Sequence, residues 1–366
     1  MAVVLSPSLI DPHDAAPAGA LRRLRARLDR AGYRAQHLGL AASTAPFLRA
    51  FHRAMAPGLP RPSWEAIDLL NRRFQDLLEQ DLTNVERGVY PRELLFQLPY
   101  GDYARALPQA LLEVPRIFLR RRRGETADLP RGVDRATYPD YYLRNFHWQS
   151  DGWLSDRSAR IYDLSVEVLF GGTADVMRRM AIPPVAEIAQ PGMQILDVGC
   201  GTGRFLRQLH RAIPGARLHG LDLSPHYISR ARAVLGGARD VGLLVENAEV
   251  IPFEAGTLDA VTSTFLFHEL PSDARRRVVR EALRVLRPGG RIVICDAAQL
   301  AESPEFEVFL QAFKDLYHEP YFKGYLRDDL ACLLTECGFE RVAATPRFVS
   351  KVVVGVKPAD GPGLYS

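Results

Sequence analysis

The chain has 366 residues, of which 47% are hydrophobic and 25% charged, a composition typical of a globular protein with more than one domain. Its formal net charge of +4 is too small to indicate a polyanionic partner. The four cysteines are irregularly spaced, which argues against a disulfide framework and against a zinc site of paired Cys-x-x-Cys type. We therefore expect a reducing, cytoplasmic location and no metal centre, and we find neither a signal peptide nor a membrane span.

The first third of the chain is predicted to be helical. Residues 1–20 are rich in Ala and Pro and are expected to form a flexible leader. Leu21–Leu40 has helical apolar spacing with arginines between, and this face could cover the protein's own core, a membrane surface or an acidic partner. Ser63–Leu82 predicts a second helix with its first residue as N-cap. A third apolar segment, Leu107–Leu119, ends in Arg120–Arg123, which suit a solvated helix C-terminus.

A polar linker and an aromatic segment follow. Gly124–Asp134 has Gly and Pro at both ends and predicts a linker, so we take residues 21–132 as a helical accessory region. Residues 133–192 then form a lead-in or lid, in which Tyr138–Phe170 is unusually aromatic. Such a patch is either core or the wall of a pocket.

From residue 193 the pattern changes to short apolar runs that alternate with amphipathic stretches. The predicted strands are Gln194–Val198, Arg217–Leu221, Gly242–Val245, Leu258–Ser263, Arg291–Cys295, Glu340–Pro346 and Phe348–Val356. The predicted helices are Arg204–Ala212, Pro225–Leu235, Ser272–Leu286 and a last one from after Asp328 to Cys337. This alternation predicts an α/β fold, a Rossmann-like doubly wound seven-stranded sheet whose last two strands form an antiparallel hairpin. The domain spans residues 193–357, and residues 358–366 form a tail.

The stretch QILDVGCGTGRFLRQL, residues 194–209, places three glycines directly behind the first predicted strand. In a doubly wound sheet, such a bend lies where a nucleotide-like ligand binds. A dinucleotide fingerprint needs a third glycine where Arg204 stands. The carboxylate of Asp197 also suits an ammonium group better than a pyrophosphate.

The stretch resembles the class I S-adenosylmethionine-dependent methyltransferases, whose hallmark is D-x-G-x-G-x-G, here Asp197 to Gly203. LHGLDLS, VENAEVIPFEAGTLDAV and LRPGGRIVI resemble the family's next segments, in the methyltransferase type 11 or ubiquinone/menaquinone C-methyltransferase-like branch. The resemblance covers about residues 162–357 and implies S-adenosylmethionine as cofactor.

The resemblance also implies a set of cofactor-binding residues. Asp222 stands where the family takes the ribose hydroxyls, and Asn247 replaces the commoner aspartate of the adenine site, where its amide still forms hydrogen bonds. The full set is Asp197, Gly199, Cys200, Gly201, Thr202, Gly203, Asp222, Leu223, Asn247, Ala248, Glu249 and Thr264.

Catalysis of methyl transfer needs an aligned nucleophile, and a base only where that nucleophile carries a proton. His268 and Glu269 follow the fourth strand of the domain, where the family places residues facing the cofactor. His268 is either a base for a phenol, enol or acidic carbon, or a positioning residue at the methionine end of the cofactor. Both alternatives stay open.

Aromatic residues on both sides of the glycine bend predict a closed, mostly apolar substrate pocket. Those expected to line it are Tyr142, Trp153, Tyr162, Phe265, Tyr317, His318, Tyr321 and Tyr325, with Tyr141, Phe146, Trp148 and Phe322 nearby. A lid over residues 314–326 would close it. Such a pocket favours a planar or lipid-like small molecule over a nucleic acid.

The leading hypothesis is therefore methyl transfer to carbon or oxygen of a quinone, polyketide or other aromatic or lipid-like metabolite. The alternative is a protein that keeps the fold and the cofactor for a pericyclic, decarboxylative or regulatory role. The accessory region is open to three interpretations: a lid, a dimer contact or a peripheral membrane contact. The oligomeric state, monomer or homodimer, is equally open.

Overall fold

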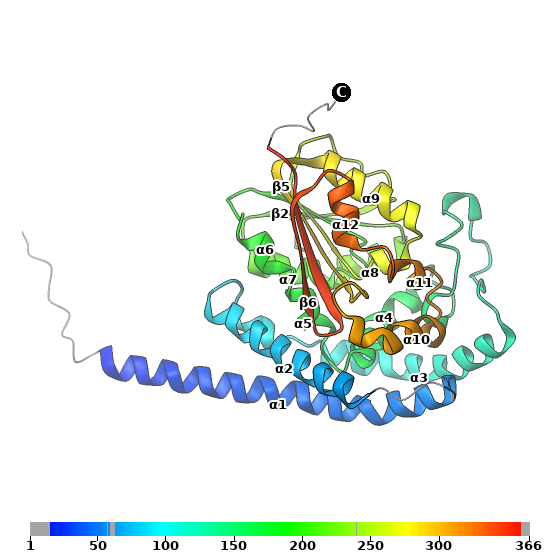
Figure 1. Cartoon of the computed structure of the whole chain (residues 1–366), viewed down its shortest axis with the longest axis horizontal. Coiled ribbons are helices and arrows are strands. Elements are labelled where there is room, and N and C mark those ends of the chain that lie inside the picture. Colours follow the sequence, from blue (N-terminus) through cyan, green and yellow to red (C-terminus); the bar gives the residue numbers. More distant parts are fainter. Residues whose placement is uncertain (1–14, 57, 59–62, 239, 360–366) are drawn as a thin grey trace, which may run out of the picture.

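The computed structural model describes residues 15–56, 58, 63–238 and 240–359, so residues 1–14 of the expected leader and 360–366 of the expected tail lie outside it. A seven-stranded sheet with helices on both faces rests on three long N-terminal helices (Figure 1). This architecture agrees with the predicted doubly wound α/β fold.

The strand order of the sheet is β3-β2-β1-β4-β5-β7-β6, with β7 antiparallel to both of its neighbours. The strands are β1 Gln194–Val198, β2 Arg217–Asp222, β3 Val241–Val245, β4 Leu258–Thr264, β5 Leu286–Ala297, β6 Glu340–Arg347 and β7 Ser350–Val356. β5 begins at Leu286 and not at Arg291, because Leu286 pairs with Leu258 ahead of a register shift. The antiparallel edge is the predicted hairpin.

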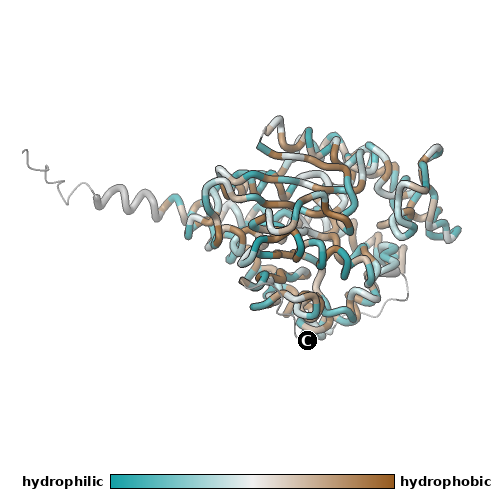
Figure 2. The backbone as a smooth tube through the Cα atoms, turned by 90° about the horizontal axis from the view of Figure 1, so that it is seen from above, coloured by the Kyte–Doolittle hydropathy of each residue, from teal (hydrophilic) through white to brown (hydrophobic). Residues whose placement is uncertain are grey.

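Helices cover both faces of the sheet. The helices of this part are α4 Asp156–Leu169, α5 Ala174–Arg179, α6 Ile182–Ala186, α7 Arg204–Ala212, α8 Pro225–Val234, α9 Ser272–Val285, α10 Glu307–Tyr317, α11 Phe322–Tyr325 and α12 Leu330–Glu336. Short 3-10 turns are η1 Arg92–Phe96, η2 Arg135–Thr137, η3 Phe146–Trp148, η4 Phe267–Glu269 and η5 Pro304–Phe306. One apolar core lies between the sheet and α5 to α7, and a second lies between the sheet and α9 and α12. In Figure 2 hydrophobic and hydrophilic stretches alternate along the backbone, as expected for elements with one face toward a core.

The N-terminal helices are longer than the sequence pattern predicts. They are α1 Ala15–Met55, α2 Trp64–Glu86 and α3 Tyr100–Arg123. α1 begins at Ala15, inside the segment expected to be a flexible leader. Ser63 caps α2 as predicted, since its side chain accepts a hydrogen bond from Ala66 N. Trp64, the first residue of α2, is 83% exposed.

Arg120 corrects the expectation of a solvated arginine run at the end of α3. Its guanidinium is buried and donates hydrogen bonds to the carbonyl of Trp148, to Ser150 Oγ and to the carboxylate of Asp128. A cation that satisfies three acceptors is tolerated inside the protein. It thereby ties α3 to the predicted linker and to the aromatic segment.

A buried ionic network joins the N-terminal helices to the sheet domain. Arg179 of α5 donates to both carboxylate oxygens of Asp81 in α2, with a distance of 2.9 Å from Nε to Oδ1. The hydroxyl groups of Tyr33 and Tyr90 donate to the same carboxylate. All four side chains are at most 3% exposed, so each depends on the others for its hydrogen bonds.

We expect Asp81→Ala to lower the free energy of unfolding by about 3 kcal/mol or more, because it leaves Arg179 buried without a partner. Chemical denaturation measures the change. The control is Asp68→Ala, which removes an exposed ion pair with Arg72 and costs about 1 kcal/mol or less. Equal losses for the two variants would contradict a role of this network in joining the two parts.

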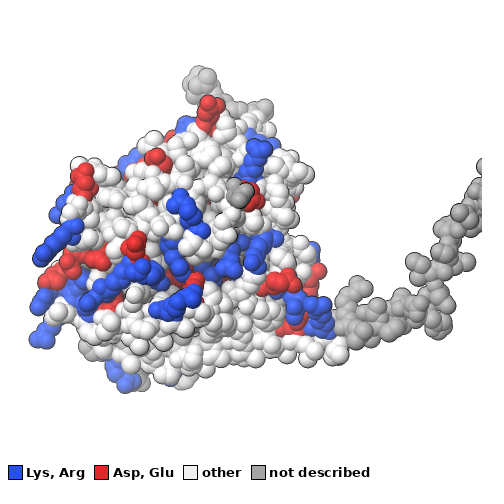
Figure 3. Space-filling model, turned by 180° about the vertical axis from the view of Figure 1, so that it is seen from behind, with Lys and Arg blue, Asp and Glu red and all other residues white. Residues whose placement is uncertain are grey.

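No helix among the described residues is both long enough and apolar enough to cross a lipid bilayer. On the face shown in Figure 3, acidic and basic side chains interleave in a band across the middle of the molecule. Opposite charges mixed in this way differ from the broad basic face typical of nucleic-acid binding.

Candidate functional site

The glycine loop joins β1 to α7 and takes its shape from backbone that only glycine adopts without strain. Gly199, Gly201 and Gly203 have φ values of 66°, 54° and 75°. A Cβ atom at Gly199 would lie 2.9 Å from the Leu266 side chain, and one at Gly203 would lie 3.0 Å from Ala231 Cβ. These two glycines therefore also allow close packing, whereas a Cβ atom at Gly201 would meet only the Tyr227 ring, at 4.0 Å.

Two aspartates, the buried Asp197 and the partly buried Asp222, stand at the ends of β1 and β2, next to this loop. Asp197 Oδ1 accepts a hydrogen bond of 2.8 Å from Thr262 Oγ1, while Oδ2 has no partner among the described residues. Asp222 accepts hydrogen bonds of 2.9 Å from the backbone amides of Gly201 and Ser224. Burial raises the pKa of Asp197 to about 7, helped by the charge of Asp222, and raises the pKa of Asp222 to about 6.

A cavity of about 100 Å³ opens beside the loop, and we call it the loop cavity. Of the predicted cofactor residues, Gly199, Cys200, Gly201, Thr202, Asp222 and Thr264 line it. Arg204, which stands where a dinucleotide fingerprint needs glycine, also lines it and pairs with the buried Asp175. The wall does not include the remaining predicted residues, which are Asp197, Gly203, Leu223, Asn247, Ala248 and Glu249.

The predicted adenine segment lies beside Asp222, because the amide of Glu246 donates to the Asp222 carbonyl at 3.1 Å. Asn247 Oδ1 accepts from the amide of Glu249, which turns the chain after β3. The Glu249 carboxylate accepts from the Tyr141 hydroxyl at 2.6 Å and pairs with Arg277. Glu249 thus holds the aromatic segment against the sheet, a contact that the sequence did not predict. Leu223 directly follows β2, and Ala248 lies in the turn after β3.

His268 lies in η4 directly after β4, and its ring is held by Asp296 at the end of β5. The distance from His268 Nδ1 to Asp296 Oδ1 is 2.6 Å, and Asp296 also accepts from the amides of Phe267 and Ala297. Burial lowers the pKa of His268, but the charge and the hydrogen bond of Asp296 outweigh it, so the pKa is raised. With Nδ1 engaged, Nε2 is the remaining ring nitrogen, and it lies 3.6 Å from Glu269 Oε1.

Two apolar cavities of about 350 and 360 Å³ adjoin the loop cavity, and we call them together the chamber. Tyr162 lines all three cavities, and Phe265 lines the loop cavity and the larger chamber cavity. His268 lies in the wall of the chamber. The loop cavity and the chamber therefore share part of one wall.

Several predicted pocket residues occupy the expected walls. Tyr142, Trp153, Tyr162 and Phe265 line the loop cavity, and Tyr317 lines the chamber. His318, Tyr321 and Tyr325 lie outside the walls of these three cavities, whereas Phe322 of the predicted lid segment lines the chamber. Tyr325 is fully buried with its hydroxyl on the Ala297 carbonyl, His318 packs on Trp148, and Tyr321 packs edge-on against Tyr141.

The N-terminal helices supply much of the chamber wall, which sequence reasoning missed. The wall includes Phe47, Leu48 and Phe51 from α1 and Leu107, Leu111 and Ile117 from α3. Of these, Phe47, Leu107 and Leu111 are exposed, so they mark the open side of the chamber. No motif identified them, because apolar helix positions read the same whether they face a core or a cavity.

A family model described as "Methyltransferase domain" matches residues 195–290. Demethylmenaquinone methyltransferase of Lactococcus lactis is 33% identical, covering 37% of this chain and 50% of that protein. Ubiquinone/menaquinone biosynthesis C-methyltransferase of Desulfotalea psychrophila is 34% identical, covering 41% and 59%. O-methyltransferase rstn1 of Aspergillus nomiae is 35% identical, covering 42% and 67%. The chain thus spans about half to three fifths of the length of the first two relatives.

The fold and the loop define a doubly wound α/β protein with a ligand site at the point where the strand order reverses. Within that class, the chain belongs to the class I S-adenosylmethionine-dependent methyltransferases, in the ubiquinone/menaquinone C-methyltransferase-like branch.

We expect the affinity for S-adenosylmethionine to fall about tenfold between pH 8 and pH 6. Asp197, with a pKa of about 7 in the free protein, is then protonated and must lose its proton before it can face a cation. Isothermal titration calorimetry across this range measures the effect.

Asp197→Asn should bind more weakly at pH 8 and lose most of the pH dependence. Asp240→Asn, at an exposed site paired with His210, is the matched control and should follow the wild type. A variant at position 197 that retains the full pH dependence would assign the effect to another group.

Proposed function

We propose that the protein transfers a methyl group from S-adenosylmethionine to carbon or oxygen of a hydrophobic small molecule. The observation that carries the proposal is the shared wall of the loop cavity and the chamber, formed by Tyr162 and Phe265. A cavity beside the glycine loop that shares a wall with a larger apolar volume suits a charged donor next to an apolar acceptor.

The residues around the loop cavity fit the cofactor. Asp197 Oδ2 is a buried acceptor without a partner among the described residues, as an ammonium group requires. Each Asp222 oxygen accepts one backbone amide and keeps a lone pair for a ribose hydroxyl. Gly201 leaves space where a side chain would stand. When bound, the cofactor supplies an electrophilic methyl group on a sulfonium.

The chamber favours an aromatic or lipid-like acceptor. Its volume is that of a pocket for a small organic ligand, and its wall is built mainly of Leu, Val and Phe side chains. Two relatives carry names for methylation of demethylmenaquinone and of ubiquinone or menaquinone precursors, and a third is named an O-methyltransferase. We infer a quinone-like or phenolic ring as the acceptor.

His268 is the candidate base, and Asp296 is the positioning residue that holds its ring. Because Nδ1 bonds Asp296, Nε2 is available to take a proton from a hydroxyl or an acidic carbon in the chamber. The buried Asp296 stabilises the imidazolium that results. If His268 only positions the cofactor, its mutation should instead weaken cofactor binding and leave turnover unchanged.

We expect His268→Gln to lower kcat about a hundredfold while the affinity for S-adenosylmethionine changes less than twofold. Asp296→Asn should give a smaller loss of kcat, since the imidazole remains. His210→Gln, at an exposed site, is the control. Unchanged turnover with weakened cofactor binding would support the positioning role and refute the base.

To identify the methyl acceptor, the full-length protein is incubated with S-adenosylmethionine labelled in its methyl group and with a hydrophobic extract of host cells. We expect label in an organic-soluble product. Cofactor binding without any labelled product would instead favour the non-methylating alternative, a pericyclic, decarboxylative or regulatory role.

Leu169→Trp separates the acceptor from the cofactor, because Leu169 lines both chamber cavities but not the loop cavity. The added ring should lower kcat/KM for the labelled reaction at least tenfold, since it fills acceptor space, and leave cofactor affinity unchanged. Leu38→Trp, at an exposed position on α1, serves as the control. If both variants turn over alike, the chamber is not the acceptor site.

A further inference from the structure

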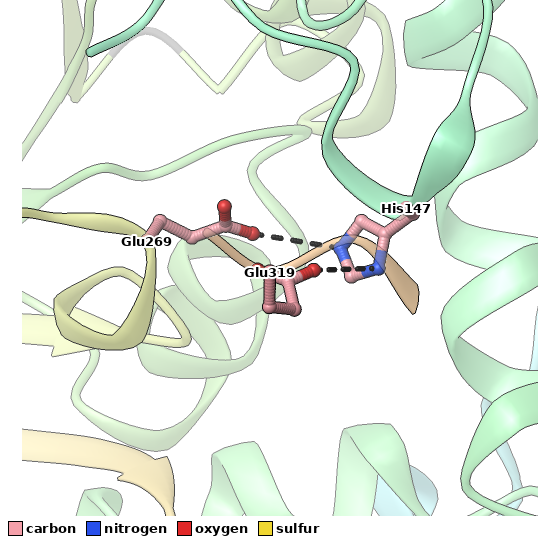
Figure 4. Close-up of side chains that lie close together, drawn as sticks. All are labelled: His147, Glu269 and Glu319. Carbon is pink, nitrogen blue, oxygen red and sulfur yellow. Dashed lines mark ion pairs between the residues drawn. The ribbon is translucent and has the colours of Figure 1, made fainter. Parts of the chain in front are cut away.

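Three ionisable side chains from distant segments meet between the loop cavity and the chamber. His147 of η3, Glu269 of η4 and Glu319 between α10 and α11 point toward one another (Figure 4). His147 Nε2 lies 3.5 Å from Glu269 Oε1, and His147 Nδ1 lies 3.1 Å from Glu319 Oε1. One nitrogen or oxygen from each residue lies within 4.8 Å of the other two.

The two carboxylates of this cluster lack the partners that buried charges need. Glu319 is 0% exposed, and neither of its oxygens has a hydrogen bond within the described part of the chain. Glu269 is 9% exposed, and its Oε2 is also without a partner there. Among the side chains that the structure describes, no Lys or Arg forms an ion pair with either carboxylate. His268 Nε2 lies 3.6 Å from Glu269 Oε1, but that imidazole is already held by Asp296. His147 is then the one imidazole left for two carboxylates, and the cluster can accommodate a further cation.

We propose that His147, Glu269 and Glu319 bind one divalent cation of the first transition row, Mn²⁺, Fe²⁺ or Zn²⁺. An imidazole nitrogen with two carboxylate oxygens is a donor set that these ions accept. Three atoms at most 4.8 Å apart leave a point within about 2.8 Å of all three, so small side-chain rotations reach the 2.0–2.3 Å of metal bonds.

The position of the cluster indicates what the cation would contact. Glu269 lines the loop cavity and His147 lines both cavities of the chamber, so the cluster lies at their boundary. Three protein ligands leave coordination positions open to water or to a substrate oxygen. This role assumes the proposed function and favours an acceptor with a hydroxyl or carbonyl group, whereas metal binding itself does not depend on methyl transfer.

The test uses the full-length protein, stripped with a chelator and titrated separately with Mn²⁺, Zn²⁺ and, without oxygen, Fe²⁺. We expect one ion per chain by calorimetry and elemental analysis, and a rise in Tm with at least one ion. Glu319→Gln and His147→Gln should each weaken binding at least tenfold and abolish the rise in Tm. Glu281→Gln, an acidic residue paired with Arg284 outside the cluster, should bind like the wild type.

The metal site is overturned if the cluster holds a proton in place of a metal ion. Burial and the neighbouring Glu269 raise the pKa of Glu319, so without a metal the two carboxyl groups would share a proton. Glu319→Gln would then keep or raise the Tm, and none of the three ions would bind stoichiometrically. That outcome overturns the metal site and leaves the proposed methyl transfer untouched. Stoichiometric metal binding without any methyl transfer would overturn the proposed function and leave the metal site supported.

Discussion

The site depends on the reversal of strand order between β1 and β4. β1 pairs with β2 on one side and with β4 on the other, so the crossover helices leave toward opposite faces and the carboxyl ends of the strands stay uncovered. The polar groups of the site come from these ends: Asp197 near the end of β1, Asp222 at the end of β2, Glu269 beyond β4 and Asp296 near the end of β5. The sheet topology thereby concentrates carboxylates at one edge, where they are buried together.

These carboxylates differ in the number of hydrogen bonds that they accept. Asp296 accepts two backbone amides and an imidazole, and Asp222 accepts two amides. Asp197 accepts one hydrogen bond, and Glu319 accepts none within the described residues and has only its ion-pair contact with His147. A buried charge without enough partners is unfavourable. The carboxylates with the fewest hydrogen bonds are the two beside which we propose that external cations bind, an ammonium group beside Asp197 and a metal ion beside Glu319.

The two parts of the chain contribute different surfaces to one site. The sheet domain supplies the polar loop cavity, and α1 and α3 supply much of the apolar chamber wall. Arg120 and the Asp81–Arg179 pair bind these helices to the rest of the molecule through buried hydrogen bonds. Of the three interpretations of the accessory region, this geometry supports a cover over the acceptor volume.

The sequence by itself determined the strand and helix pattern, the glycine loop and the Ser63 cap, because each depends on residues a few positions apart. It also predicted Asp197, Asp222 and His268 at strand ends. Only the tertiary structure decided that Arg120 is buried, that Tyr325 leaves the pocket wall, and that His147 meets Glu319. Those outcomes depend on packing between distant segments, for which no local spacing rule exists, since an apolar or charged position reads the same on either side of a cavity wall.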